Sequence, residues 1–162
     1  MSNNFTLITG AAGFLGYYHC CSLIEIDKPI IAVDINQKKI IKLKKKLFSE
    51  FNVKKIHFFK VDITREKEII KLKNNLKKKK IKIDSIINNA AIDAVPNKNS
   101  NDWSFVDNKQ WHKELDVSLL GSYLIIKHFI NDMYLSRSGS IVNIGSDLSV
   151  VAPNQNIYKK TF

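Results

Sequence analysis

The chain has 162 residues, of which 44% are hydrophobic and 25% charged, and its 26 lysines and arginines exceed its 15 aspartates and glutamates. This length predicts one domain with its own core, and six glycines and three prolines are too few for a collagen-like, low-complexity or disordered chain. Adjacent Cys20 and Cys21 cannot form a secreted disulfide framework, and because no signal peptide or membrane-spanning run is readable, we expect a cytoplasmic protein.

The formal net charge of +11 raises the alternative of a basic nucleic-acid-binding domain. The lysine runs at 44–46 and 77–80 fall on predicted helix faces or ends, with few aromatic residues among them. Arginine, which reads base edges, occurs only at Arg65 and Arg137. We therefore expect a solvated lysine-rich surface and no specific nucleic-acid partner.

Short apolar runs alternate with longer amphipathic stretches, a pattern typical of βαβ units. The run at 29–34 is apolar without a break, as expected for a parallel strand buried on both faces. We expect strands at residues 5–9, 29–34, 55–61, 84–88 and 140–144, and helices at 14–27, 37–51, 65–80 and 109–133. The predicted fold is α/β: a Rossmann-type doubly wound parallel sheet of about five strands, in a single domain over residues 1–162 that is truncated after the fifth strand.

Two segments outside this alternation have separate interpretations. The polar stretch 91–108 contains Pro96 and several asparagines, so we expect a loop over the site. The helix at 109–133 is apolar around most of its circumference. We expect one face to pack on the sheet and the other to meet a partner, which makes a homo-oligomer through this helix a hypothesis.

A glycine-rich motif at residues 9–16, T-G-A-A-G-F-L-G, follows the first strand and begins the first helix. Gly10 allows a tight turn, Gly13 lets the backbone approach a pyrophosphate, and Gly16 lets the helix pack closely on the sheet. The pyrophosphate of a dinucleotide would then meet the helix N-terminus. A glycine turn without a ligand is the alternative.

Two aspartates end neighbouring strands. Asp34 can accept hydrogen bonds from the adenosine ribose, which favours NAD over NADP, although Lys38 and Lys39 are close in sequence; a simple strand-end turn is the alternative. Asp62 can reach the adenine edge, and a helix cap near Thr64 is an equally good interpretation.

Five motifs together resemble those of the short-chain dehydrogenase/reductase family, in its order and spacing, from Phe5 to Ser146. They are residues 9–16, Val33-Asp34, V-D-I at 61–63, N-N-A-A at 88–91 and G-S-I-V-N-I-G-S at 139–146. The resemblance implies an NAD(P)-dependent oxidoreductase that transfers hydride to or from a hydroxyl or ketone of a small substrate. On this basis the residues assigned to the cofactor are Thr9, Gly10, Gly13, Phe14, Leu15, Gly16, Asp34, Asp62, Ile63, Asn89, Ala90 and Ala91.

The resemblance also implies catalytic positions, with two departures. Ser146 matches the serine that hydrogen-bonds the substrate, whereas Ser118 stands where the family has an asparagine that holds a water. The family's Tyr-x-x-x-Lys pair moves the proton, but the residue four positions after Tyr158 is Phe162, which carries no charge. Tyr158 is either a substrate-loop residue, with the catalytic pair absent, or a degenerate catalytic position.

A narrower similarity, at residues 89–93 and 146–155, is to members associated with bacterial surface-sugar and flagellin-glycan modification. The four histidines have no metal-ligand spacing, so no metal site is predicted. The alternative to an NAD(P)-dependent oxidoreductase is a non-catalytic dinucleotide-binding remnant. Ending after the fifth strand is expected to leave Ile141, Val142 and Ile144 on an uncovered edge strand.

Overall fold

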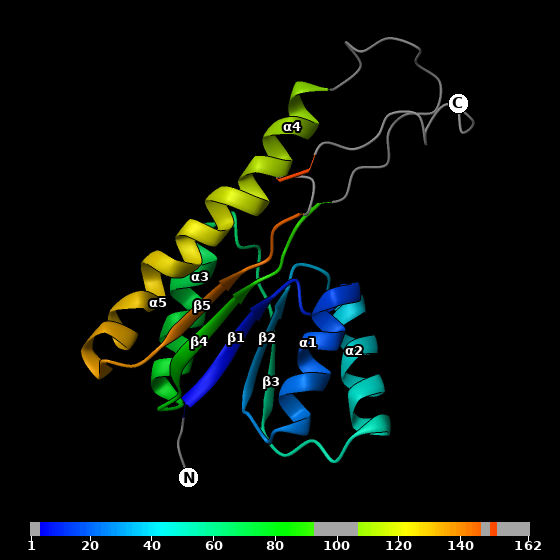
Figure 1. Ribbon diagram of the computed structural model, residues 1–162, viewed down its shortest axis with the longest axis vertical. Coiled ribbons are helices and arrows are strands. Elements are labelled where there is room, and N and C mark those ends of the chain that lie inside the picture. Colours follow the sequence, from blue (N-terminus) through cyan, green and yellow to red (C-terminus); the bar gives the residue numbers. More distant parts are fainter. Residues whose placement is uncertain (1–3, 93–106, 147–149, 152–162) are drawn as a thin grey trace.

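The computed structural model describes residues 4–92, 107–146 and 150–151, and its strands form one parallel sheet in the order β3-β2-β1-β4-β5. The strands are β1 (Asn4–Thr9), β2 (Ile30–Asp34), β3 (Ile56–Lys60), β4 (Lys82–Asn88) and β5 (Ser140–Asn143). The helices are α1 (Phe14–Glu25), α2 (Gln37–Glu50), α3 (Glu66–Lys78), α4 (Asn108–Leu115), the π-helical η1 (Asp116–Gly121) and α5 (Ser122–Ser136). Figure 1 shows α1 and α2 on one face of the sheet and α3 and α5 on the other. The predicted fold class is confirmed.

The central strands have unbroken apolar runs because both of their faces are covered. Leu7 of β1 lies beside Ile31 of β2 and Ile86 of β4, and all three pack in the cluster under α3 and α5. Their neighbours Ile8 and Ala32 point the other way, into the cluster under α1 and α2. Strand alternation therefore divides one apolar run between two cores.

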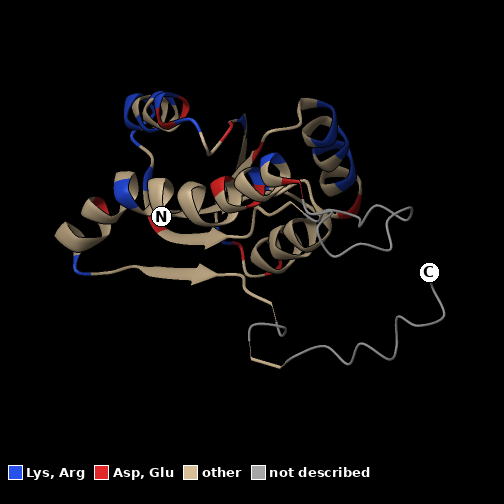
Figure 2. Cartoon of the chain, turned by 90° about the horizontal axis from the view of Figure 1, so that it is seen from above, with Lys and Arg blue, Asp and Glu red and all other residues tan. Residues whose placement is uncertain are grey.

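The helices supply the matching apolar stripes. On α3 the buried residues are Ile69, Leu72 and Leu76, a spacing that places them on one face. The lysines of α2 and α3 lie on the outward sides of these helices, where Figure 2 shows the positive charge gathered. Among the described residues, none of the helices combines the length and the apolar composition that crossing a bilayer requires.

The predicted helix at 109–133 is not one regular α-helix, which corrects the sequence-based expectation. It runs from Asn108 to Ser136, with the π-helical segment η1 in its middle. At Gly121 a Cβ atom would lie 2.7 Å from the Ile63 side chain, so close packing requires glycine there. Periodicity near 3.6 residues cannot reveal a local widening of this kind.

Strand β5 pairs with β4 and lies at the edge of the sheet in the part of the chain that the structure describes. Ile141 packs against the core under α3 and α5. On the opposite face, Val142 is 48% exposed and Ile144, just beyond the strand, is 39% exposed. Apolar surface at this edge is therefore open among the described residues.

Candidate functional site

Two cavities formed by described residues lie at opposite ends of the sheet. A cavity of about 480 Å³ lies at the carboxyl ends of the strands, lined by the glycine-rich loop, residues 33–36, residues 61–63, residues 89–92 and Val117. A cavity of about 630 Å³ lies near the amino ends of β1 and β4, between α3 and α5. Open parallel α/β sheets bind ligands outside the carboxyl ends of their strands, which favours the smaller cavity.

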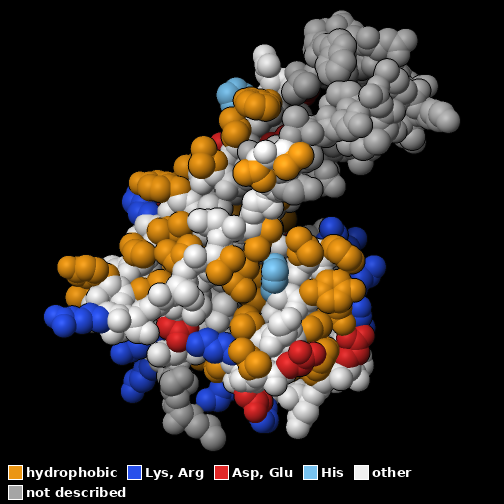
Figure 3. All heavy atoms as spheres, in the orientation of Figure 1, with side chains coloured by type: hydrophobic (Ala, Val, Ile, Leu, Met, Phe, Trp, Pro, Cys, Tyr) orange, Lys and Arg blue, Asp and Glu red, His pale blue; other side chains and the backbone are white. Residues whose placement is uncertain are grey.

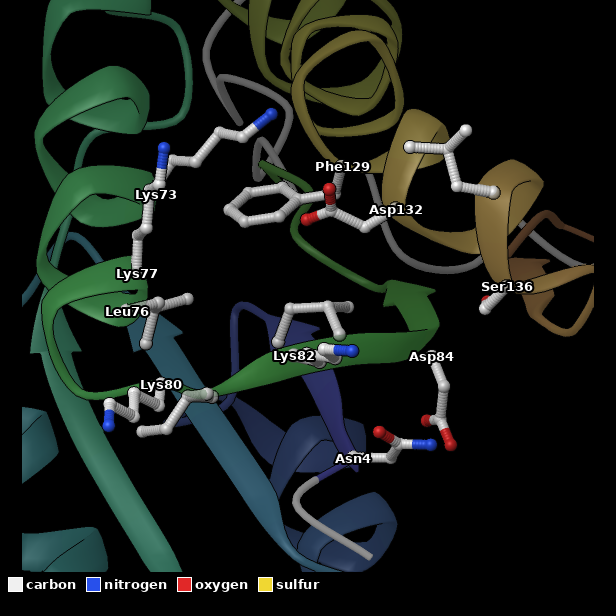
Figure 4. Close-up of a pocket in the computed structure, with 13 residues that line it drawn as sticks. Asn4, Lys73, Leu76, Lys77, Lys80, Lys82, Asp84, Phe129, Asp132 and Ser136 are labelled. Atoms are coloured by element: carbon white, nitrogen blue, oxygen red, sulfur yellow. The ribbon is translucent and has the colours of Figure 1, made fainter.

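The larger cavity is mainly a junction between helices. Figure 4 shows Phe129 and Asp132 of α5 opposite Lys73 and Lys77 of α3. Lys73 Nζ donates a hydrogen bond to the backbone oxygen of His128, at 2.6 Å, and so joins the two helices. Lysines near the end of α3 also complement the negative end of the helix dipole. These lysines therefore stabilise α3 and its contact with α5, and their positions are explained without a bound ligand.

The glycines of residues 9–16 have different roles in the structure. Gly10 has φ +61°, and a Cβ there would lie 2.8 Å from the Cα of Ala90, so both conformation and space require glycine. At Gly16 a Cβ would lie 2.2 Å from the Gly10 oxygen, because α1 packs directly on the loop. Gly13 borders the cavity, and its Cβ would meet only the Gly10 oxygen, at 3.2 Å.

The start of α1 is suited to an anion. Gly13 is its N-cap and offers no side-chain cap, and the first turn carries no acidic residue. The amide donors of a helix N-terminus and its partial positive charge attract phosphate groups. Phe14 and Leu15 line the cavity beside this turn and are exposed.

Thr9 and Asn89 hold the glycine-rich loop against the end of β4. The Thr9 hydroxyl oxygen accepts hydrogen bonds from the backbone N–H groups of Asn89, at 3.0 Å, and Ala90, at 3.1 Å. In return, Asn89 Nδ2 donates to the backbone oxygens of Thr9 and Gly10, both at 3.1 Å. Thr9 is fully buried, and like Gly16 it supports the cavity without lining it.

Asp34 forms a strand-end turn, contacts the glycine-rich loop and borders the cavity. Its Oδ1 accepts a hydrogen bond from the backbone N–H of Asn36, at 2.9 Å, which is the expected strand-end turn. Its Oδ2 accepts from the backbone N–H of Ala12 in the glycine-rich loop, at 3.0 Å. The side chain also borders the cavity, and the residue is only 9% exposed.

Asp62 likewise borders the cavity and holds a turn. Its Oδ1 accepts from the backbone N–H of Thr64, at 3.0 Å, and from the Thr64 hydroxyl, at 2.7 Å. Arg65 Nε lies 3.3 Å from Asp62 Oδ2, and the backbone N–H of Asp62 donates to the Glu68 carboxylate. The helix α3 begins after Arg65, so Asp62 organises the turn before that helix.

Neither of the described residues with an implied catalytic role, Ser118 and Ser146, lines the cavity. Ser118 lies in η1 and its hydroxyl donates to the Glu114 backbone oxygen, at 2.6 Å. Ser146 follows β5 and is exposed, whereas Tyr158 lies outside the described residues. In the described ranges, no three His, Cys, Asp or Glu side chains are grouped as a metal site would require.

Several lining residues were not identified from the sequence. Ile35 and Asn36 directly follow Asp34, so the strand end itself could have indicated them. Lys39, which the sequence already indicated as close to Asp34, is brought to the cavity by the first turn of α2, where its N–H donates to the Asn36 side chain. Val117 reaches the cavity from η1, for which the sequence contains no signal.

Comparison with known proteins gives consistent results. A family model described as short chain dehydrogenase matches residues 4–159. An uncharacterised oxidoreductase of Saccharomyces cerevisiae is 30% identical over 154 residues, which cover 94% of this chain and 46% of that protein. The chain spans about half the length of the curated relatives it matches.

Solved structures share the fold. An NAD+-bound xylitol dehydrogenase aligns with a TM-score of 0.79 at 22% identity, covering 99% of this chain and 59% of that one. A metagenomic short-chain oxidoreductase in complex with NADP aligns with a TM-score of 0.76 at 18% identity, covering 90% and 63%. Proteins of this fold therefore bind either nicotinamide dinucleotide.

Proposed function

Because the chain belongs to the short-chain dehydrogenase family, we propose that it forms the dinucleotide-binding part of an NAD(P)-dependent oxidoreductase. The proposed reaction is hydride transfer between the nicotinamide and a hydroxyl or ketone carbon of a small substrate. The observation that carries this proposal is the cradle at the 480 Å³ cavity, where Gly13 and the uncapped first turn of α1 are open to an anion.

The residues around the cavity suit the parts of a dinucleotide. Gly13 and the first turn of α1 would hold the pyrophosphate, and Asp34 would accept hydrogen bonds from the adenosine ribose. Asp62 and Ile63 would border the adenine, while residues 89–91 would lie along the nicotinamide half. When bound, the nicotinamide ring supplies the carbon that gives or takes the hydride.

We propose NAD as the preferred cofactor. The Asp34 carboxylate is fixed at the cavity by two backbone amides, so a 2′-phosphate would meet a like charge that cannot turn away. Lys39 borders the same cavity, and its ammonium group would reduce this repulsion. The preference is therefore a difference in affinity rather than exclusion of NADP.

The proton that accompanies the hydride has no assigned donor in residues 1–162. Ser146 would orient the substrate oxygen, but the position four residues after Tyr158 is Phe162, which cannot lower the pKa of a tyrosine. We propose that this polypeptide by itself binds the dinucleotide and has no turnover. The same departure supports the second candidate function, a non-catalytic dinucleotide-binding protein.

Fluorescence titration with NADH and NADPH tests the proposal. We expect NADH to bind more tightly than NADPH, and Gly13→Leu to abolish binding of both while the melting temperature stays close to that of the unmodified chain. If the unmodified chain binds NADH and NADPH equally well, or NADPH more tightly, the proposal that Asp34 selects NAD is wrong. Failure to bind either cofactor, together with a salt-dependent shift of DNA, would favour the basic nucleic-acid-binding alternative.

The substrate needs a separate measurement. Consumption of NADH is followed with a panel of ketones and keto-sugars, and no turnover is expected from residues 1–162. Turnover that disappears on Tyr158→Phe would instead identify Tyr158 as catalytic.

Because both cysteines are unpaired and buried, a reducing compartment suits the chain, and we propose a cytoplasmic location.

The helical segment from Asn108 to Ser136 is the proposed site of self-association. Its large exposed apolar residues are Trp111, Leu115, Leu119, Leu120, Tyr123, Ile130, Tyr134 and Leu135. Figure 3 shows hydrophobic side chains along this side of the molecule. An apolar surface of this kind is typical of interfaces, and a second copy of the chain is the proposed partner.

A further inference from the structure

Asp34 joins two segments that must both be in place to form the cavity. Its Oδ2 accepts a hydrogen bond from Ala12 in the loop after β1, at 3.0 Å, and its Oδ1 accepts from Asn36 in the turn after β2, at 2.9 Å. One carboxylate therefore links the pyrophosphate side of the cavity to the adenosine side. Hydrogen bonds from amides to an ionised acceptor are stronger than those between neutral groups.

Other links from this loop to neighbouring segments come before the Asp34 contact along the chain. The backbone N–H of Ala11 donates to the Val33 oxygen, at 3.0 Å, and Asn89 holds the carbonyls of Thr9 and Gly10. The contact from Ala12 to Asp34 is the next one along the chain, immediately before Gly13. It therefore positions the peptide that leads into the proposed pyrophosphate cradle.

We propose that Asp34 is a positioning residue for the glycine-rich loop, so that its carboxylate is required to bind any dinucleotide and not only to distinguish NAD from NADP. This inference rests on the proposed dinucleotide-binding function. If Asp34 acted only on the ribose, replacing it would remove the repulsion of the 2′-phosphate and strengthen NADPH binding. Removing Asp34 instead leaves the amides of Ala12 and Asn36 without their acceptor and frees the loop, which weakens binding of both cofactors.

A ligand that lacks the ribose contact separates the two roles. The probe is an NADH analogue whose adenosine ribose has neither the 2′- nor the 3′-hydroxyl, so that Asp34 cannot act on it as a ribose reader. Affinities for NADH, NADPH and this analogue are measured for the unmodified chain and for Asp34→Ala. Asp132→Ala is the control, because it removes an exposed carboxylate at the opposite end of the sheet.

We expect Asp34→Ala to weaken binding of the dideoxy analogue about tenfold or more, in keeping with the loss of a hydrogen bond to a charged group. NADPH binding should weaken as well, and Asp132→Ala should leave all three affinities unchanged. Unchanged affinity of Asp34→Ala for the analogue, or tighter binding of NADPH, would overturn the inference. If the unmodified chain binds none of the three ligands, the proposed function itself fails.

A second variant and a second measurement keep the test decisive if Asp34→Ala does not fold. Asp34→Asn has nearly the same shape, but its amide nitrogen must face one of the two backbone donors. We expect the analogue to bind this variant more weakly, and amide exchange to accelerate at Ala12 or Asn36 but not at Ala11, whose acceptor is the Val33 oxygen. Unchanged affinity and unchanged exchange in Asp34→Asn would contradict the positioning role.

Discussion

At the scale of single residues, the glycines of the glycine-rich loop have different surroundings: Gly10 and Gly16 are packed within the chain, whereas Gly13 borders the cavity. Gly10 and Gly16 are required by contacts within the chain, at 2.8 Å to Ala90 and 2.2 Å to the Gly10 oxygen. Gly13 meets one oxygen at 3.2 Å and otherwise faces the cavity. Substitutions at Gly10 and Gly13 should therefore affect different properties, stability in one case and binding in the other.

Gly10→Ala should lower the free energy of unfolding by about 2 kcal/mol, because it combines an unfavourable positive φ with a clash against the backbone of Ala90. Gly145→Ala is the matched control, since a Cβ at Gly145 would have no neighbour within 4 Å among the described residues. Urea unfolding measures both variants. Equal stability of the two variants would show that the Gly10 conformation is not required.

The Cys20 thiol has a pH dependence that the structure determines. Burial raises its pKa to about 12, with a smaller contribution from Cys21. Since an exposed thiol has a pKa of about 8.5, the unfolded chain loses this proton at a lower pH than the folded chain. The free energy of unfolding should therefore fall as the pH rises from about 9 towards 12.

Comparison with Cys20→Ala isolates this contribution, because lysines and tyrosines titrate in the same range in both proteins. Urea unfolding at pH 7.5, 9 and 10.5 should give a shallower decline for the variant. In the folded chain at pH 8, alkylation of Cys20 should be slow and should accelerate on unfolding. Identical pH dependence of the two proteins would contradict the raised pKa.

At the scale of elements, the segment from Asn108 to Ser136 has two apolar faces with different surroundings. Leu124, Ile125 and Phe129 are buried against the sheet and α3. Lys127 and His128 each lie 2.8 Å from Glu66 of α3, and hydrogen bonds from these two groups lower the pKa of Glu66. The opposite face presents Leu119 and other large apolar side chains to solvent.

The combined substitutions Leu119→Glu and Tyr123→Glu should reduce self-association, because they introduce like charges on the exposed face without entering the core. Light scattering after size exclusion should give a larger mass for the unmodified chain than for this variant. Phe48→Glu, at a similarly exposed apolar residue of α2, should leave the mass unchanged. An unmodified chain that remains monomeric at all concentrations would contradict this interface.

At the scale of the whole molecule, the described residues leave β5 at the edge of the sheet with Val142 and Ile144 partly exposed. Full burial of such a side chain contributes about 1.5–3 kcal/mol, and a domain is stable by only about 5–15 kcal/mol. Because Val142 and Ile144 are 48% and 39% exposed, completing their burial would contribute a part of this amount for each. Unpaired strand edges also favour association between chains.

We expect the polypeptide of residues 1–162 to melt at a low temperature and to aggregate through this edge. Val142→Lys should reduce aggregation, because a charged side chain on an edge strand opposes pairing with another chain. Calorimetry and light scattering test both statements. A monomer with a sharp, high melting transition would contradict the expectation.

The strands, most of the helices, the parallel sheet and the position of the cavity at the carboxyl ends of the strands could be predicted from the sequence. Each of these depends on patterns within one short segment: an apolar run such as residues 29–34, an amphipathic stretch, or three glycines at a turn between strand and helix. For that reason Gly10, Gly13 and Asp34 could be singled out before the fold was known.

The contacts of those residues depend on how the elements pack together. The link between Asp34 and Ala12 and the link between Thr9 and Asn89 each join segments that are distant in the sequence, and they exist because strand register brings the ends of β1, β2 and β4 together. Val117 reaches the cavity from a π-helical segment that the hydrophobic periodicity of the sequence does not predict. Local patterns specify elements and the turn between Asp34 and Asn36, whereas distances between elements arise from packing, and packing brings the Ala12 amide to Asp34.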